Sequence, residues 1–126
     1  MPASFDYAVL RVVPRVERQE FINAAVVAFC PEKRYLDARI HLDALRLQAL
    51  WPEADADLIR QHLEAVRRIC AGDPAAGPIA RLSQRERFHW LVSPRSTIIQ
   101  PSPVHTGVCD DTEGMLDRLA KQFLLP

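Results

Sequence analysis

The chain is organised around Phe21-Ile22-Asn23-Ala24-Ala25-Val26-Val27-Ala28-Phe29-Cys30, an apolar run in which Asn23 is the one polar residue. Its β-branched centre predicts a strand, and the near absence of polar side chains on either face predicts a central place in a sheet. Before it, Tyr7–Val13 is rich in β-forming residues and ends at Pro14, which predicts another strand.

A third strand is expected just after this run. In Tyr35–Leu42 every second residue is apolar, whereas the residues between them are polar or aromatic, which is the pattern of a half-buried strand. Pro31-Glu32-Lys33-Arg34 joins the two segments and places proline where a tight turn accepts it. The first third of the chain is therefore predicted to be an antiparallel meander.

Helical periodicity begins after Asp43, first as a short helix or turn that Pro52 interrupts. Asp55–Ala71 has apolar residues at steps of three and four, acidic residues early and Gly72 just beyond, which predicts a long amphipathic helix. Ser83 and Glu86 have capping-box spacing and predict a short helix that ends before Pro94.

The C-terminal part adds a strand and a helix to this plan. Thr97–Gln100 is a candidate fourth strand, and Asp110 or Asp111 can cap a last helix with a buried apolar stripe. We therefore expect one α+β domain over residues 1–126: an antiparallel sheet of three to four strands packed by two main helices plus short helices. Both main helices are expected on one face of the sheet.

Composition narrows the classes of function. The chain has 126 residues, and its 16 basic and 16 acidic side chains cancel, so binding to nucleic acid is possible but not favoured. No run approaches the roughly 20 apolar residues of a membrane span, and no signal peptide is recognisable, so we expect a cytoplasmic protein. The widely spaced Cys30, Cys70 and Cys109 are typical of reduced thiols. No metal site and no cofactor are expected.

The segment Ser93–Asp111 contains many chemically active side chains and three prolines. Arg95 with two hydroxyls beside it can receive an anion such as phosphate, or it can pair with a carboxylate such as Asp110 while Ser96 begins a strand. Proline stiffness lowers the entropy that binding would cost, which suits recognition. The candidate binding residues are Arg95, Ser96, Thr97, Gln100, Ser102, His105 and Thr106.

A catalytic interpretation centres on His105, whose imidazole can take and give a proton near neutral pH. Asp110 or Asp111 would orient it, and a nearby hydroxyl or Cys109 would be the nucleophile. No strand-to-helix elbow around a serine supports such a triad. The simpler interpretation is that His105 bonds to backbone and holds a loop in shape, and that Cys109 is a small buried side chain.

Another group of residues, on the predicted Ser83–Val92 helix and beside it, superficially suits nucleic acid. Arginines at 81, 85, 87 and 95 lie near Phe88, His89 and Trp90 in the sequence. On a helix, however, Phe88 and Leu91 would share a buried face and leave the arginines on an ordinary solvated side. We favour that structural interpretation.

Several of these residues together resemble the bacterial domain-of-unknown-function family DUF3037. The resemblance rests on Tyr7–Pro14, on Phe88 and Trp90, and above all on the Arg95-Ser96-Thr97, Gln100–Pro103 and His105-Thr106-Gly107 motifs. Members of the family are often encoded beside a kinase that resembles the HipA toxin kinases. The resemblance therefore implies a small companion that docks on or regulates a HipA-like Ser/Thr kinase, in a context like that of toxin–antitoxin systems.

Two functions are carried forward from the sequence. The first is a non-enzymatic interaction or regulatory module that works with a HipA-like kinase through the Arg95–Thr106 segment. The alternative is a small enzyme or binding protein for phosphorylated or nucleic-acid ligands, in which His105 is the acid or base and Arg95 holds phosphate.

Overall fold

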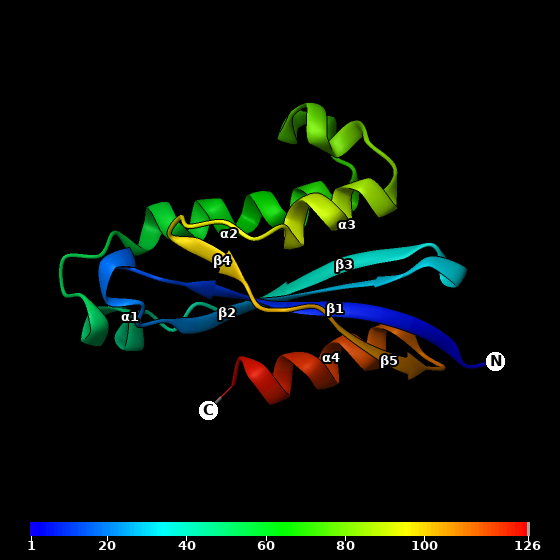
Figure 1. Cartoon of the computed structure of the whole chain (residues 1–126), viewed down its shortest axis with the longest axis horizontal. Coiled ribbons are helices and arrows are strands. Elements are labelled where there is room, and N and C mark those ends of the chain that lie inside the picture. Colours follow the sequence, from blue (N-terminus) through cyan, green and yellow to red (C-terminus); the bar gives the residue numbers. More distant parts are fainter. Residues whose placement is uncertain (126) are drawn as a thin grey trace.

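A computed structural model describes residues 1–125 and shows a five-stranded antiparallel sheet with helices on both faces (Figure 1). The strands are β1 (Ala3–Val12), β2 (Ile22–Cys30), β3 (Tyr35–Ile40), β4 (Ile99–Pro101) and β5 (His105–Cys109). β2 lies between β1 and β3, and β4 and β5 pair one after the other with the free edge of β1. The predicted α+β class and the meander are confirmed, and the sheet has one strand more than predicted.

Four α-helices and several short 3₁₀ turns accompany the sheet. The helices are α1 (Ala44–Leu50), α2 (Ala56–Ala71), α3 (Gln84–Val92) and α4 (Thr112–Phe123). Asp43 and Asp55 accept backbone N–H groups at the starts of α1 and α2, and Ser83 and Glu86 form the predicted capping box of α3. No helix within residues 1–125 is long and apolar enough to cross a membrane.

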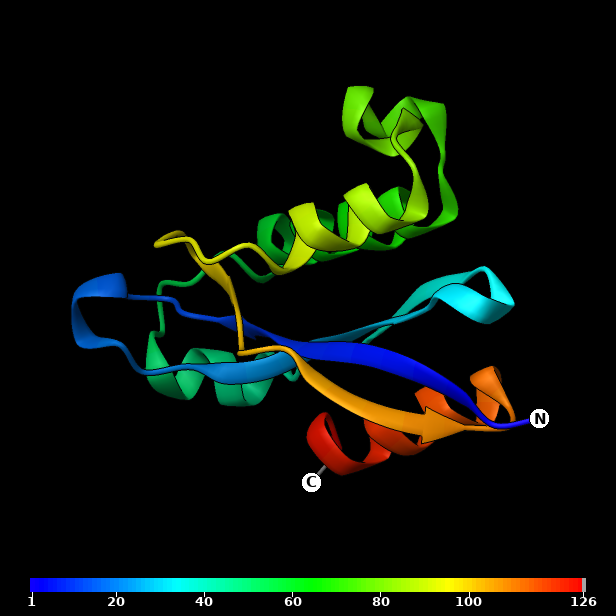
Figure 2. The ribbon, with the colours of Figure 1, turned by 45° about the vertical axis from the view of Figure 1, so that its right-hand side comes forward.

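The helices divide between the two faces of the sheet, contrary to the prediction that α2 and the last helix share one face (Figure 2). Because side chains alternate along a strand, Val27 and Phe29 of β2 pack with α2 and α3, whereas Val26 and Ala28 pack with α4. A central strand that is apolar on both faces needs cover on both, so the composition of β2 explains the arrangement.

β5 is the strand that the sequence analysis placed in a stiff loop. His105 lies opposite Tyr7 and Gly107 lies opposite Phe5 in the register with β1. A Cβ atom added at Gly107 would come within 2.6 Å of Cζ of the buried Phe5 ring, so any larger residue here would force that ring to shift. β5 fixes the direction in which the chain enters α4.

Candidate functional site

The candidate binding residues lie along the outer edge of the sheet, where the two short strands β4 and β5 follow each other. Between them the backbone N–H of Ser102 donates to Val9 O at 2.8 Å, and the Ser102 hydroxyl accepts from Val9 N at 2.9 Å. The same hydroxyl donates to Pro103 O at 2.9 Å. Ser102 is the one buried polar side chain within residues 1–125. Its hydroxyl replaces a backbone carbonyl and so joins the two strands to β1.

The segment Arg95–Pro101, called here the edge segment, contributes to two hollows. Arg95, Thr97, Ile99 and Pro101 line one of about 310 Å³, together with residues of α2 and α3. Ser96 and Gln100 line another of about 330 Å³, which also contains Arg11. The two hollows lie on opposite faces of the sheet edge because neighbouring strand residues point to opposite sides. Four of the seven predicted binding residues are thus divided between two hollows, and Ser102, His105 and Thr106 line neither.

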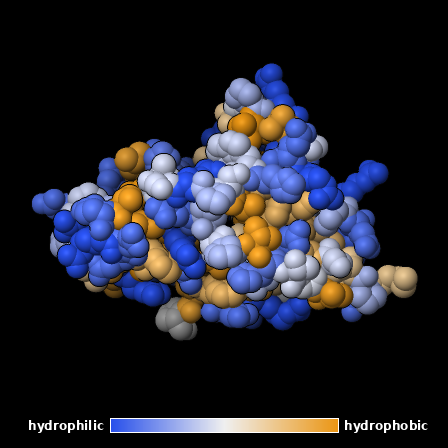
Figure 3. Space-filling view, viewed as in Figure 1, coloured by the Kyte–Doolittle hydropathy of each residue, from blue (hydrophilic) through white to orange (hydrophobic). Residues whose placement is uncertain are grey.

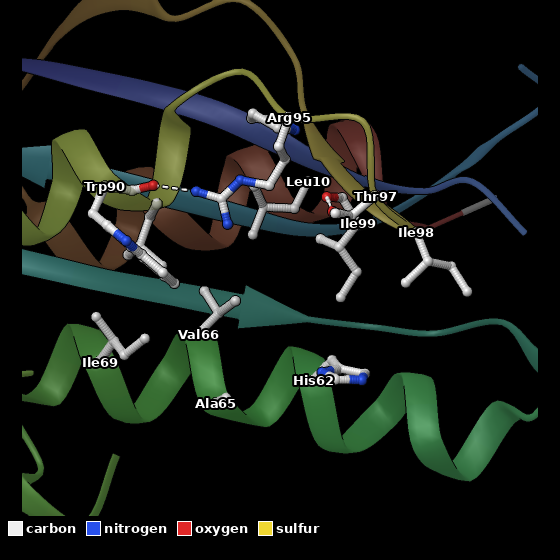
Figure 4. A pocket seen from close by; sticks show the side chains of 12 residues that line it. Leu10, His62, Ala65, Val66, Ile69, Trp90, Arg95, Thr97, Ile98 and Ile99 are labelled. Carbon is white, nitrogen blue, oxygen red and sulfur yellow. Dashed lines mark hydrogen bonds between the residues drawn. The ribbon is translucent and has the colours of Figure 1, made fainter. Parts of the chain in front are cut away.

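The first hollow, called here the α2 groove, lies between α2 and the edge segment (Figure 4). Val66 and Ile69 of α2 face Leu10 and Ile99 of the sheet across it. The face drawn in Figure 3 shows several small hydrophobic patches, one of them near its middle, among polar residues. The other residues of the groove are His62, Ala65, Trp90, Leu91, Arg95, Thr97, Ile98 and Pro101.

Arg95 lines one side of the α2 groove, between Trp90 and Ile99 (Figure 4). Its guanidinium donates hydrogen bonds to the carbonyl oxygens of Trp90 and, at 3.2 Å, of Ser93, at the C-terminal end of α3. It also lies 4.7 Å from the centre of the Trp90 ring, which is 40% exposed. These carbonyls are the partners of Arg95, rather than the carboxylate of Asp110 considered above. Arg95 and Trp90 therefore form a fixed pair at the rim of the groove.

The second hollow, called here the Arg11 pocket, contains a residue that sequence reasoning did not single out. Arg11 lies in β1 opposite Gln100 of β4, and both line the pocket. The sequence held one signal for Arg11, its position inside the otherwise apolar run 8–13. The sequence of β1 alone does not show which residues lie beside it in the fold. The remaining lining residues are Val13, Val16, Gln19, Phe21 and Ser96.

His105 and its proposed catalytic partners stand at opposite ends of β5. The His105 ring packs 5.5 Å from the Tyr7 ring, centre to centre. Asp110 and Asp111 follow the other end of the strand, and five residues of extended chain span roughly 16 Å. Asp111 begins α4 as predicted, although its side chain makes no capping hydrogen bond. The structure does not bring His105 and these carboxylates together.

Thr106 and Thr97 make local hydrogen bonds. The Thr106 hydroxyl donates to Asp6 Oδ1 at 2.8 Å across the β1–β5 pair, and the Thr97 hydroxyl donates to Ile99 O at 3.0 Å. Both residues are exposed at the sheet edge, so they remain candidates for contact with a partner.

The arginines of α3 are partly used inside the fold. Arg87 donates to the carbonyls of Ile69 and Cys70 at 2.8 Å and so satisfies the C-terminal end of α2. Phe88 and Leu91 are buried, which confirms the predicted buried face of α3. Among residues 1–125, no three His, Cys, Asp or Glu side chains come together in a way that could hold a metal ion.

The three cysteines are free and buried, so Cys109 is the small buried side chain that the sequence favoured. Burial raises the pKa of Cys70 to about 12 and also raises the pKa of Cys109. A nucleophilic thiol needs the opposite shift.

We expect the thiols of the native protein to react slowly with a disulfide reagent such as DTNB at pH 8, and all three to react rapidly in denaturant. The pKa of Cys70 is higher in the native state than the ordinary thiol value of 9.0, and this difference contributes to the stability of the native state. The contribution is complete at pH values below 9.0. This contribution declines as pH rises from about 9 toward 12, because only the unfolded thiol then loses its proton. Fast reaction of Cys109 with DTNB in the native protein would contradict its assignment as a buried, unreactive side chain.

Comparison with known proteins finds one family. A family model described as "Protein of unknown function (DUF3037)" matches residues 7–124, nearly the whole chain. No curated protein and no solved structure matches the chain.

Proposed function

The chain belongs to the DUF3037 family, whose function is unknown, and from its geometry we propose that it is a non-enzymatic interaction module whose α2 groove receives a segment of a regulated partner. The observation that carries the proposal is the groove itself. Apolar side chains from α2, α3 and the edge segment form its floor, while Arg95 and Trp90 stand at its rim. A concave, mostly apolar surface with a few placed polar groups is typical of a binding site.

The rim suggests what the partner segment carries. Tryptophan and arginine are the residues that most often dominate binding energy at protein interfaces. Arg95 is the only lining residue of the groove with a permanent charge, and its guanidinium has further N–H donors beyond those used on α3. The chemistry fits a segment in which an apolar side chain enters the groove and an acidic side chain meets Arg95.

The groove is also held in shape before any partner arrives. Ser102 fixes the end of the edge segment to β1, and Arg95 fixes its start to α3. The segment therefore has little freedom to lose on binding, which improves affinity. This is the physical basis for the recognition role that its prolines suggested.

We take a HipA-like kinase as the partner, because the family resemblance implies such a neighbour. In this proposal the module docks on the kinase and regulates it, in a context like that of toxin–antitoxin systems. The partner is protein, and neither catalysis by His105 nor binding of nucleic acid is part of the proposal.

The test is a calorimetric titration of the purified chain with the HipA-like kinase encoded in the same genome. Ala65→Glu places a charged side chain in the groove, where its desolvation should weaken binding at least about tenfold. Arg67→Gln is the matched control, since it changes net charge by the same amount on an exposed part of α2 outside the groove lining. Equal binding by the two variants would contradict the proposed contact face.

A further inference from the structure

We propose that the Arg11 pocket is a second binding site, which takes a phosphate monoester group. It lies on the other face of the sheet edge from the α2 groove and does not depend on the function proposed for that groove. Its hollow of about 330 Å³ lies within the range of small-ligand sites, so it can admit a phosphate with part of the molecule that carries it.

Arg11 is the pocket residue with a buried donor atom that has no hydrogen-bond partner in the described part of the chain. Its Nε is buried and has no hydrogen-bond partner within residues 1–125. Its guanidinium lies 4.4 Å from the centre of the Phe21 ring, which holds the charge in place without satisfying its N–H groups. A buried donor atom without an acceptor is costly, while the rest of this half-buried guanidinium is open to a ligand in the pocket.

The pairing of β1 with β2 is irregular next to Arg11. The pairing of β1 with β2 shifts register between Leu10 and Arg11, because the partner passes from Ala25 to Asn23 and Ala24 of β2 has no partner in β1. Such irregularities increase the local twist of the two strands and occur often beside functional sites. The irregularity of the β1–β2 pair therefore lies beside the residue whose Nε has no partner among the described residues.

Further donors surround the guanidinium. Ser96 contributes an exposed hydroxyl, and Gln100 uses one N–H of its side-chain amide on Thr97 O and keeps a second. Gln19 contributes another amide from the turn between β1 and β2. Donors from three separate segments suit the several oxygens of a phosphate better than the two oxygens of a carboxylate.

Acidic side chains do not oppose an anion here. No lining residue of the Arg11 pocket is a carboxylate. Glu17 and Glu20, in the same turn as Gln19, pair with Arg15 at 2.9 Å and with Arg18 at 2.5 Å. The local charge of the pocket is therefore positive, although the net charge of the chain is zero.

The anion site therefore differs from the one that the sequence suggested. Arg95 faces the α2 groove and donates there to two backbone carbonyls, whereas Arg11 lies among the other donors of the Arg11 pocket, so we place phosphate at Arg11. Ser96 is the one residue of the Arg95-Ser96-Thr97 motif that lines the Arg11 pocket.

The experiment titrates ¹⁵N-labelled protein with inorganic phosphate at constant ionic strength and follows by NMR the Arg11 Nε–H in the wild type and the side-chain amide of Gln100 in the wild type and every variant. We expect saturable shifts, because phosphate oxygens would accept hydrogen bonds from the Arg11 guanidinium and the Gln100 amide that line the pocket. Arg11→Met should abolish binding, and Arg11→Lys should weaken it about tenfold, since lysine keeps the charge and loses the fork of donors. Arg95→Met is the control on the opposite face and should bind phosphate like the wild type.

Two further measurements separate the possible outcomes. Glycerol 3-phosphate and a blocked phosphoserine tripeptide distinguish a small metabolite from a phosphorylated protein as the source of the group, and binding of either supports the site. Arg11→Met should melt at or above the temperature of the wild type, because its buried Nε loses no partner. No saturable shift at millimolar phosphate, or unchanged binding by both Arg11 variants, overturns the proposal while leaving the α2 groove untouched.

Discussion

Replacing Phe88 by alanine is expected to lower the free energy of unfolding by about 3–5 kcal/mol, the range for a large aromatic side chain removed from a core. Phe88 is 2% exposed, and its ring lies 5.4 Å from that of Phe29 in the central strand β2, centre to centre. The contact fastens α3 to the sheet. Urea denaturation followed by far-ultraviolet circular dichroism measures the loss.

The same substitution should also weaken the proposed binding, because α3 carries Trp90 and Leu91 into the α2 groove. His89→Ala is the matched control on the same helix: His89 is exposed, so its change should stay within about 0.5 kcal/mol. If Phe88→Ala were no more destabilising than His89→Ala, the packing of α3 on β2 described above would be incorrect.

Ser102→Ala should have the second largest effect, a loss of about 1–3 kcal/mol, although it removes a single oxygen atom. The change leaves the N–H of Val9 without its acceptor in a buried part of β1. It also removes the hydrogen bond to Pro103 O that stabilises the break between β4 and β5. Thermal and urea unfolding would both record the loss.

Ser96→Ala serves as the control for Ser102→Ala, because Ser96 is an exposed serine of the same edge. Its stability should change by no more than about 0.5 kcal/mol. Amide hydrogen exchange adds a local readout: Val9 N–H should exchange faster in Ser102→Ala than in Ser96→Ala. Unchanged protection of Val9 would show that its hydrogen bond to the serine hydroxyl does not hold the strand.

Most of the fold could be predicted because its signals are local. The apolar run of β2, the capping box of α3 and the periodicity of α2 each depend on neighbouring residues, and each prediction is confirmed. The placement of α4 was missed because it depends on which face of β2 lacks cover. The strand β5 was missed because a short segment with glycine and polar residues becomes a strand only through pairing with β1.

The candidate site was predicted only in part, for a related reason. The sequence located the edge segment, but its functional side chains diverge to two faces once it pairs with β1. Arg11 was missed because its neighbours, Ser96 and Gln100, lie more than eighty positions away along the chain. Pairing at long range creates both hollows, and composition and periodicity carry no information about it.

The most direct test of the α2 groove as a contact face is hydrogen–deuterium exchange of this chain, alone and with an excess of the HipA-like kinase. The account predicts slower exchange in α2 around Ala65 and in the edge segment, together with little change in α4 on the opposite face. Protection confined to α4 or β3, with none in the groove, would contradict it.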